Sequence, residues 1–268
     1  MIHVDLCMHT RPDREPSRKV YLRELSGNDE LSSGSATELI DALLVDRPGA
    51  AARAGDTAKL TLAETDRVLA AIYHSLYGDE VESHVSCSAC GSSYALSFTI
   101  ADFWDAVTEA TAADEKLLEE LDGPDGQGAY QLGTLRFRLP TGEDLAEVAA
   151  LDQENAAAAL RARGVLQEDP RYTDETLDRV MALAGPTLDT DVDGVCPNCG
   201  AEQALPFRMD EFLFAALWRE SALLTREVHE LARAYRWSRR EILEMPRRER
   251  RQHAGLVLAE AASDGRWA

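Results

Sequence analysis

Apolar and polar residues alternate along short stretches of the chain and recur at helical spacing along longer ones. Alternation predicts four short strands, over residues 20–25, 94–100, 134–139 and 203–209. Apolar residues three and four apart predict four helices, over residues 37–45, 62–77, 145–163 and 174–184. In the helix over residues 62–77, for example, Val68, Leu69, Ile72 and Leu76 share one face. The pattern predicts an α+β fold that is mostly helical.

The last part of the chain is patterned as helices only. One helix is predicted over residues 212–235, with an apolar stripe formed by Leu217, Leu224, Val228, Leu231 and Tyr235. Ser238 and Glu241 form a capping box that begins the next helix, with Trp237 and Ile242 as a hydrophobic staple across the cap. Pro246 then opens a final helix over residues 247–262.

Two stretches of the sequence resemble each other closely. Residues 87–103 read CSACGSSYALSFTIADF and residues 196–212 read CPNCGAEQALPFRMDEF, with seven identical positions. Upstream, an Asp-Arg-Val triplet precedes both copies, and a segment around Asp29 has a counterpart around Asp144. Three matches in the same order predict an internal duplication, that is, two pseudo-symmetric halves with similar plans.

This repeat divides the chain. We expect an N-terminal tail (residues 1–19), a first repeat (20–120), a second repeat (131–215) and a C-terminal helical extension (216–268). Residues 121–130 are rich in glycine, which predicts a linker between the copies.

The charge is distributed unevenly. The chain has a formal net charge of −20, yet residues 217–268 hold 11 arginines and 8 acidic residues, a net of +3, so residues 1–216 carry −23. A body this acidic repels phosphate and disfavours binding to nucleic acid or to an anionic membrane. Residues 1–19 have no apolar core typical of a secretory signal, so we expect a cytoplasmic protein without a membrane partner.

Four of the five cysteines form two C-x-x-C-G motifs, Cys87/Cys90 and Cys196/Cys199. Two thiols separated by a tight turn can face one point, and glycine after the second cysteine allows the positive φ that closes the turn. Two such knuckles supply four thiolates, which is the ligand set of a structural zinc site. The duplication would bring the knuckles together around one Zn²⁺ per chain.

Other readings of the cysteines remain open at this point. The four thiols could be buried and free, or joined as disulfides. A redox site would need a single C-x-x-C at the start of a helix, whereas these motifs lead into strands. A catalytic zinc would need a free coordination position, which four thiolates do not leave. Cys7 is interpreted as a plain thiol and His84 as a surface residue.

No motif in the sequence gives a positive argument for catalysis, so we expect a protein that is not an enzyme. A second class stays open, because residues 228–240 have the outline of a DNA-binding helix-turn-helix with Arg239 and Arg240 on its second helix. The alternative function is therefore a zinc-ribbon transcription regulator. Glu241 and Glu244 on the same helix, and the acidic body, oppose binding to DNA.

Several motifs together resemble one protein family. They are Arg23-Glu24-Leu25-Ser26-Gly27 with Asp29, the two cysteine knuckles, Tyr235-x-Trp237-Ser238, and Glu241-Ile242-Leu243-x-Met245-Pro246-Arg247-Arg248-Glu249-Arg250. In this order they resemble the T4-type baseplate hub assembly proteins of contractile-tailed phages and related injection systems. The resemblance extends over about residues 20–260.

The resemblance implies a non-enzymatic assembly factor or structural component that holds hub or tape-measure proteins in the bacterial cytoplasm. It supplies no catalytic residues. Our candidates for the partner surface are the tryptophan and the arginines of the extension: Trp237, Arg239, Arg240, Arg247, Arg248, Arg250 and Arg251.

Overall fold

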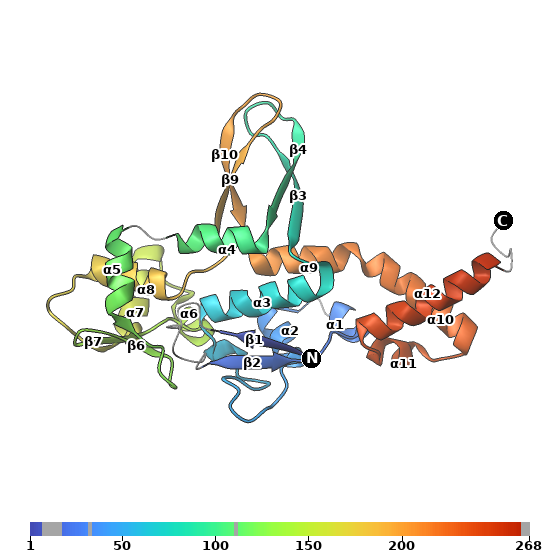
Figure 1. The fold of residues 1–268 in the computed structure, drawn as a ribbon, viewed down its shortest axis with the longest axis horizontal. Helices are drawn as coiled ribbons and strands as arrows, with labels where there is room; N and C mark the ends of the chain where they lie inside the picture. Colours follow the sequence, from blue (N-terminus) through green and yellow to red (C-terminus); the bar gives the residue numbers. More distant parts are fainter. Residues whose placement is uncertain (7–17, 32–33, 110–111, 264–268) are drawn as a thin grey trace.

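The computed structural model describes residues 1–6, 18–31, 34–109 and 112–263 (Figure 1). Within these residues the fold is α+β and mostly helical, as the patterning predicts. The helices are α1 (Gly27–Leu31), α2 (Ala36–Leu43), α3 (Leu62–Tyr77), α4 (Ile100–Thr108), α5 (Ala112–Glu120), α6 (Gly142–Val148), α7 (Gln153–Gly164), α8 (Asp174–Ala184), α9 (Met209–Arg219), α10 (Ser221–Tyr235), α11 (Arg239–Glu244) and α12 (Arg247–Ser263), with a 3-10 turn at Thr57–Lys59. The strands are β1 (Ile2–Asp5), β2 (Lys19–Leu22), β3 (Glu80–Ser86), β4 (Ser93–Thr99), β5 (Leu121–Asp122), β6 (Ala129–Leu132), β7 (Leu135–Arg138), β8 (Val165–Gln167), β9 (Thr190–Val195) and β10 (Glu202–Phe207). Cys7 lies outside the described residues.

The main core surrounds α3. This helix begins and ends where the pattern predicts, because Thr61 and Glu64 form a capping box at its start and Gly78, with φ 85°, ends it. Its face with Val68, Leu69 and Ile72 is buried against β1, β2 and α9. Strand β1 pairs antiparallel with β2, and Val4 and Val20 lie opposite each other in the core. The N-terminal tail predicted over residues 1–19 therefore contributes a strand to the core.

A second core lies under an antiparallel sheet with the strand order β5-β6-β7-β8. Helices α5 and α8 pack on it, burying Phe137, Val180 and Met181. The linker predicted over residues 121–130 is wrong in part, since it supplies β5 and the start of β6. The helix predicted over residues 145–163 is also corrected: it is divided into α6 and α7, because Asp152 caps a new helix through the Asn155 N–H.

The two segments that the repeat aligns have the same local structure. Arg23 donates to Asp29 through Nη1 at 2.6 Å, and Arg138 donates to Asp144 in the same way at 2.6 Å. Both aspartates also accept from the backbone N–H three residues earlier. The Arg138 guanidinium holds the pKa of Asp144 well below its usual range. The common origin of the two halves stays a prediction. A duplication would produce matched hydrogen bonds of this kind.

The C-terminal helices form an arm that extends from the body (Figure 1). The single helix predicted over residues 212–235 is divided at Glu220 into α9 and α10. The capping box of Ser238 and Glu241 is confirmed, and Trp237 packs with Ile242, Leu231 and the rest of a small cluster between α10 and α12. Arg236, with φ 62°, reverses the chain after α10.

A buried arginine–glutamate network fastens the arm to the body. It comprises Glu30 of α1, Glu220 and Glu227 at the start of the arm, and Arg247, Arg250 and Arg251 of α12. Glu30 uses one carboxylate oxygen for each of two arginines, at 2.8 Å from Arg247 Nη1 and 2.6 Å from Arg250 Nη2. Every one of these charges has a partner of the opposite sign, which is the condition under which buried ions are tolerated.

Candidate metal centre

Each C-x-x-C-G motif forms the tip of a β-hairpin. In β3–β4 the Cys87 N–H donates to the Ser92 carbonyl and the Gly91 N–H donates to the Cys87 carbonyl, both at 2.9 Å. In β9–β10 Cys196 and Gly200 repeat the arrangement with the same distances. Gly91 and Gly200 have φ of 74° and 73°, a conformation that side chains disfavour. The turn therefore aims both sulfur atoms of each hairpin in one direction.

The hairpins stand side by side on the body and meet at their tips (Figure 1). All four sulfur atoms lie within 4.8 Å of one another. The Cys87–Cys199 and Cys90–Cys196 Sγ separations are 3.7 and 3.8 Å, far longer than a disulfide bond of about 2.05 Å. The four described cysteines are therefore free thiols, drawn equally from the two motifs.

This cluster fits a tetrahedral ion. Sulfur atoms placed about 2.3 Å from a central zinc at tetrahedral angles lie about 3.8 Å from each other, close to the two separations between the hairpins. Cys87 and Cys196 are buried, whereas Cys90 and Cys199 are exposed. The four cysteines that the sequence predicts as ligands thus come together and could hold one metal ion.

Polar groups beside the sulfur atoms shift two thiol pKa values in opposite directions. The Ser92 hydroxyl, the Ser92 backbone N–H and the Asn198 amide lower the pKa of Cys90 to about 5. The Ala201 N–H favours the thiolate of Cys199, but hydrogen bonds with Cys90 and Cys87 outweigh it and raise the pKa of Cys199 to about 12. A metal ion has to displace the remaining thiol protons, so its affinity falls as the pH falls.

A second layer of polar residues ties the tips to each other. Gln203 of β10 accepts from the Ser88 N–H at 2.9 Å and donates to the Tyr94 hydroxyl at 3.0 Å. Asn198 donates to the Ser92 hydroxyl at 3.1 Å and toward Cys90 Sγ at 3.6 Å. Sequence reasoning missed these residues. The available signal was that Asn198 and Gln203 in the second repeat stand at the positions of Ala89 and Tyr94 in the first.

The base of the hairpins is joined by phenylalanines. Phe98 and Phe103 of the first copy contact Phe207 edge-on, with ring centroids 5.4 and 5.1 Å apart. Phe212 completes the cluster at 5.6 Å from Phe207. These are the four phenylalanines that the two repeats share. The hairpins are therefore joined at the base by repeat-matched aromatic rings, and repeat-matched cysteines meet at the tip.

The predicted partner residues do not form one surface. Arg239, Arg240 and Arg248 are exposed, and Arg240 pairs with Glu244 at 2.7 Å. Trp237 is half-buried and stacks on Tyr235 with the ring centroids 4.6 Å apart.

The other three arginines belong to the buried network, and the prediction needs correction there. Arg247 and Arg250 are 5 % and 0 % exposed because their guanidinium groups are held by glutamates of the same chain, so they offer a partner no side-chain surface. Arg251 is half-buried and pairs with Glu220 and Glu227. Glu30, which lies near the N-terminus and pairs with both Arg247 and Arg250, was missed because nothing local marks it.

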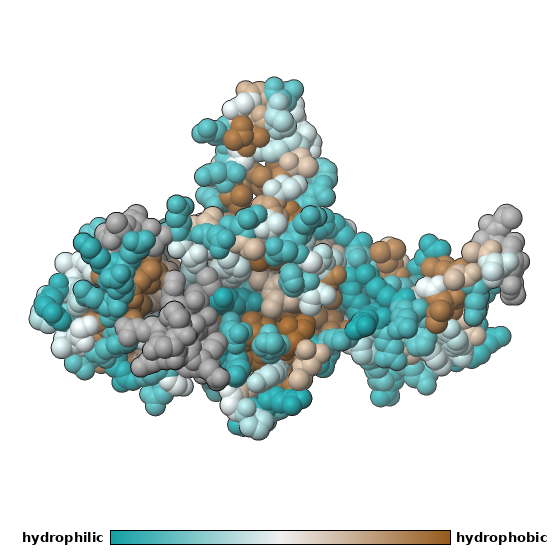
Figure 2. Space-filling view, in the orientation of Figure 1, coloured by the Kyte–Doolittle hydropathy of each residue, from teal (hydrophilic) through white to brown (hydrophobic). Residues whose placement is uncertain are grey.

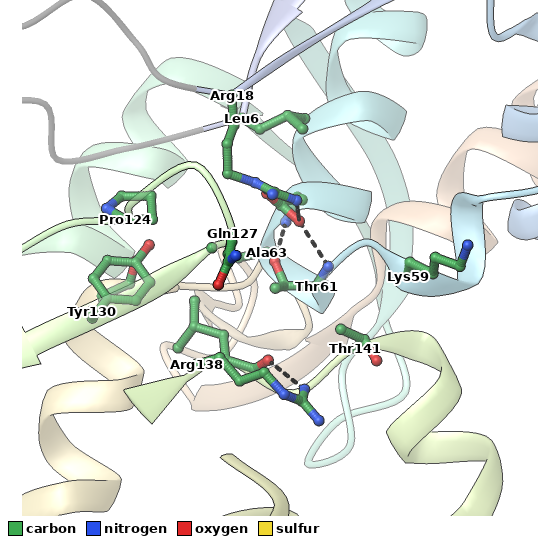
Figure 3. A pocket seen from close by; sticks show the side chains of 14 residues that line it. Leu6, Arg18, Lys59, Thr61, Ala63, Pro124, Gln127, Tyr130, Arg138 and Thr141 are labelled. Atoms are coloured by element: carbon green, nitrogen blue, oxygen red, sulfur yellow. Dashed lines mark hydrogen bonds and ion pairs between the residues drawn. The ribbon is translucent and has the colours of Figure 1, made fainter. Parts of the chain in front are cut away.

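A small cavity lies where α3 meets the second core (Figure 3). Its volume is about 60 Å³, enough for about two water molecules. The arginines that line it are engaged: Arg18 pairs with Glu64 at 2.6 Å, and Arg138 pairs with Asp144. Beside it, Thr61 and Thr141 form a backbone bridge, and the Gly142 N–H donates to the Leu60 carbonyl at 3.1 Å. The cavity marks a structural seam between the two cores.

Comparison of the chain with protein-family models, with curated protein sequences and with solved structures gives no match. In the described part of the chain, no helix has both the length and the apolar character needed to cross a lipid bilayer.

Proposed function

We propose that this protein is a zinc-stabilised, non-enzymatic assembly factor or structural component for the baseplate hub of a contractile tail or injection system. It acts by binding hub or tape-measure proteins in the cytoplasm. The observation that supports the proposal is the set of four convergent cysteines at the hairpin tips. The resemblance of the knuckles and of the C-terminal motifs to baseplate hub assembly proteins supplies the biological setting.

The metal in this proposal is Zn²⁺, one per chain. Cys87, Cys90, Cys196 and Cys199 would hold it, and four thiolates leave no coordination position for water or substrate. The ion supplies a cross-link between the hairpins, because free energy of metal binding becomes free energy of folding when the site exists only in the folded chain. The residues around it keep the hairpins parallel and shield Cys87 and Cys196.

The metal assignment is tested with Cys196→Ser, with Cys7→Ser as the matched control. The purified wild-type protein should contain one zinc per chain, and Cys196→Ser should lower zinc content and melting temperature together. Cys7→Ser should leave the zinc content unchanged. Full zinc occupancy with unchanged melting in Cys196→Ser would refute the site.

The partner assignment is tested by co-expression with tagged hub and tape-measure proteins of a contractile tail from the same source. We expect the chain to co-purify with at least one of them in stoichiometric amount. If none retains a zinc-loaded, folded chain, the assembly function is wrong. The rival class, a transcription regulator, predicts a salt-dependent mobility shift of duplex DNA instead.

A further inference from the structure

A tryptophan of the helical arm faces solvent. Trp218 at the end of α9 is 77 % exposed, more than any other large hydrophobic side chain in the described residues. A single exposed apolar residue is ordinary, but tryptophan is the residue type most enriched among the side chains that dominate binding energy at protein interfaces. Trp218 also lies out of phase with the stripe of Leu217 and Leu224, which are buried, so the helix presents it away from the core.

The exposed side around Trp218 continues from α9 into α10. Glu220, at the junction, keeps right-handed helical backbone angles with φ −90° and ψ −1°, and its carbonyl accepts from the Leu224 N–H at 3.1 Å. The two helices therefore follow one another directly, with no loop between them. Ala215, one turn before Trp218, and Ala222, one turn after it, are both exposed. Small residues on either side of a large one allow another helix to approach closely.

Farther along α10 the same side becomes basic. Arg226, His229 and Arg233 follow at helical spacing, and all three are exposed. Of the two glutamates of α10, Glu227 pairs with Arg250 and Arg251, and Glu230 is buried. In a chain whose first 216 residues carry a charge of −23, this side of the arm is a local reversal of sign.

We propose that this α9–α10 face docks an acidic amphipathic helix of a partner protein. The face is formed by Ala215, Trp218, Ala222, Arg226, His229 and Arg233. Apolar residues of the partner helix cover Trp218, and its carboxylates meet Arg226 and Arg233. The acidic body repels such a helix, so the charge pattern directs it to the arm. A symmetric pair of these faces packed as parallel helices would oppose arginine to arginine.

The inference rests on the proposed function, because it specifies how the chain binds protein. The test begins with a display library of 16-residue helical peptides whose outward positions are randomised. Selection uses the full-length, zinc-loaded wild-type chain alone, so that dependence of the peptides on Trp218 is not imposed in advance. We expect the enriched peptides to be amphipathic and rich in Asp and Glu. Their affinities are then measured by titration with synthetic peptide.

Trp218→Ala should weaken binding of the enriched peptides by about 30-fold or more, the effect typical of a central interface residue. Arg226→Glu with Arg233→Glu should also abolish binding. Leu256→Ala, which truncates an exposed apolar side chain elsewhere on the arm, should leave the affinity unchanged. All variants should keep the wild-type melting temperature, since the altered side chains are exposed.

Neutral or basic enriched peptides, no enrichment, or equal affinity for wild type and Trp218→Ala would overturn the proposal. A wild-type dimer that Trp218→Ala converts to monomer would assign the face to self-association instead. Co-purification with hub proteins that survives Trp218→Ala would leave the proposed function in place and remove only this face. Selection of acidic helices without any hub co-purification would keep this face as a docking site and remove the proposed function.

Discussion

Glu30 is the residue whose removal tests the buried arginine–glutamate network most directly. Its side chain is 4 % exposed, and its two arginine partners are 6 % and 0 % exposed. Glu30→Ala removes one negative charge from a network of three glutamates and three arginines. One positive charge is then left without compensation in a place that water does not reach.

The expected loss follows from that geometry. Removing one partner from a buried ion pair costs about 3–5 kcal/mol of unfolding free energy. Arg247 keeps Glu220 and Arg250 keeps Glu227, so we expect the lower end, about 3 kcal/mol. The matched control is Arg240→Ala, which breaks a pair whose side chains are 85 % and 52 % exposed and which should leave the urea midpoint nearly unchanged.

Urea unfolding followed by circular dichroism measures both variants, with the midpoint compared at constant slope. Combining Glu30→Ala with Arg250→Met should recover part of the loss, because the uncompensated charge is removed together with its partner. If Glu30→Ala and Arg240→Ala were equally mild, the network would not fasten the arm, and the reasoning from burial would be wrong.

Three other outcomes are expected. Burial raises the pKa of Asp66 to about 6, so its contribution to stability is present at low pH and is lost as the pH rises from about 4 through 6. In Asp66→Asn the amide oxygen can still accept from the Leu188 N–H. This variant should therefore be more stable than wild type above pH 6, by about 2–3 kcal/mol, and no more stable at pH 4. Thermal melts that show a constant difference across this pH range would contradict the assignment. Gly194→Ala should destabilise the paired hairpins, because its Cβ would lie 2.9 Å from the Tyr94 hydroxyl; an unchanged melting temperature and zinc content would show that the hairpins are not packed this closely. In gel-shift experiments at low salt the chain should not bind duplex DNA, since α11 has only six residues and carries Glu241 and Glu244; a shift there would favour the transcription regulator.

Local signals in the sequence were sufficient where a few neighbouring residues determine the structure. The capping box of Ser238 marks its helix correctly because all the bonds lie within four residues. Spacing within each knuckle identifies metal ligands for the same reason. The sequence also contained a signal for the break within the helix predicted over residues 145–163, because Asp152 is a residue type that favours the N-cap position.

Contacts between residues distant in the sequence could not be anticipated in this way. Arg247 and Arg250 resemble a solvated basic run, and only the pairing with Glu30, 217 and 220 residues away, places them inside. Strand β1 is too short for its alternation to stand out, and it forms because β2 is there to pair with it. The meeting of the two knuckles was predicted only through the repeat, which supplied a reason for distant turns to converge.

The alternation of buried and exposed cysteines has a kinetic consequence. Each hairpin contributes one sheltered sulfur, Cys87 or Cys196, and one that solvent reaches, Cys90 or Cys199. A chelator, or a protein that delivers the ion, can therefore compete for the two outer sulfur atoms while both hairpins retain their inner ones. Loading and stripping of the site would then proceed stepwise from one side, and the hairpins would separate only at the last step.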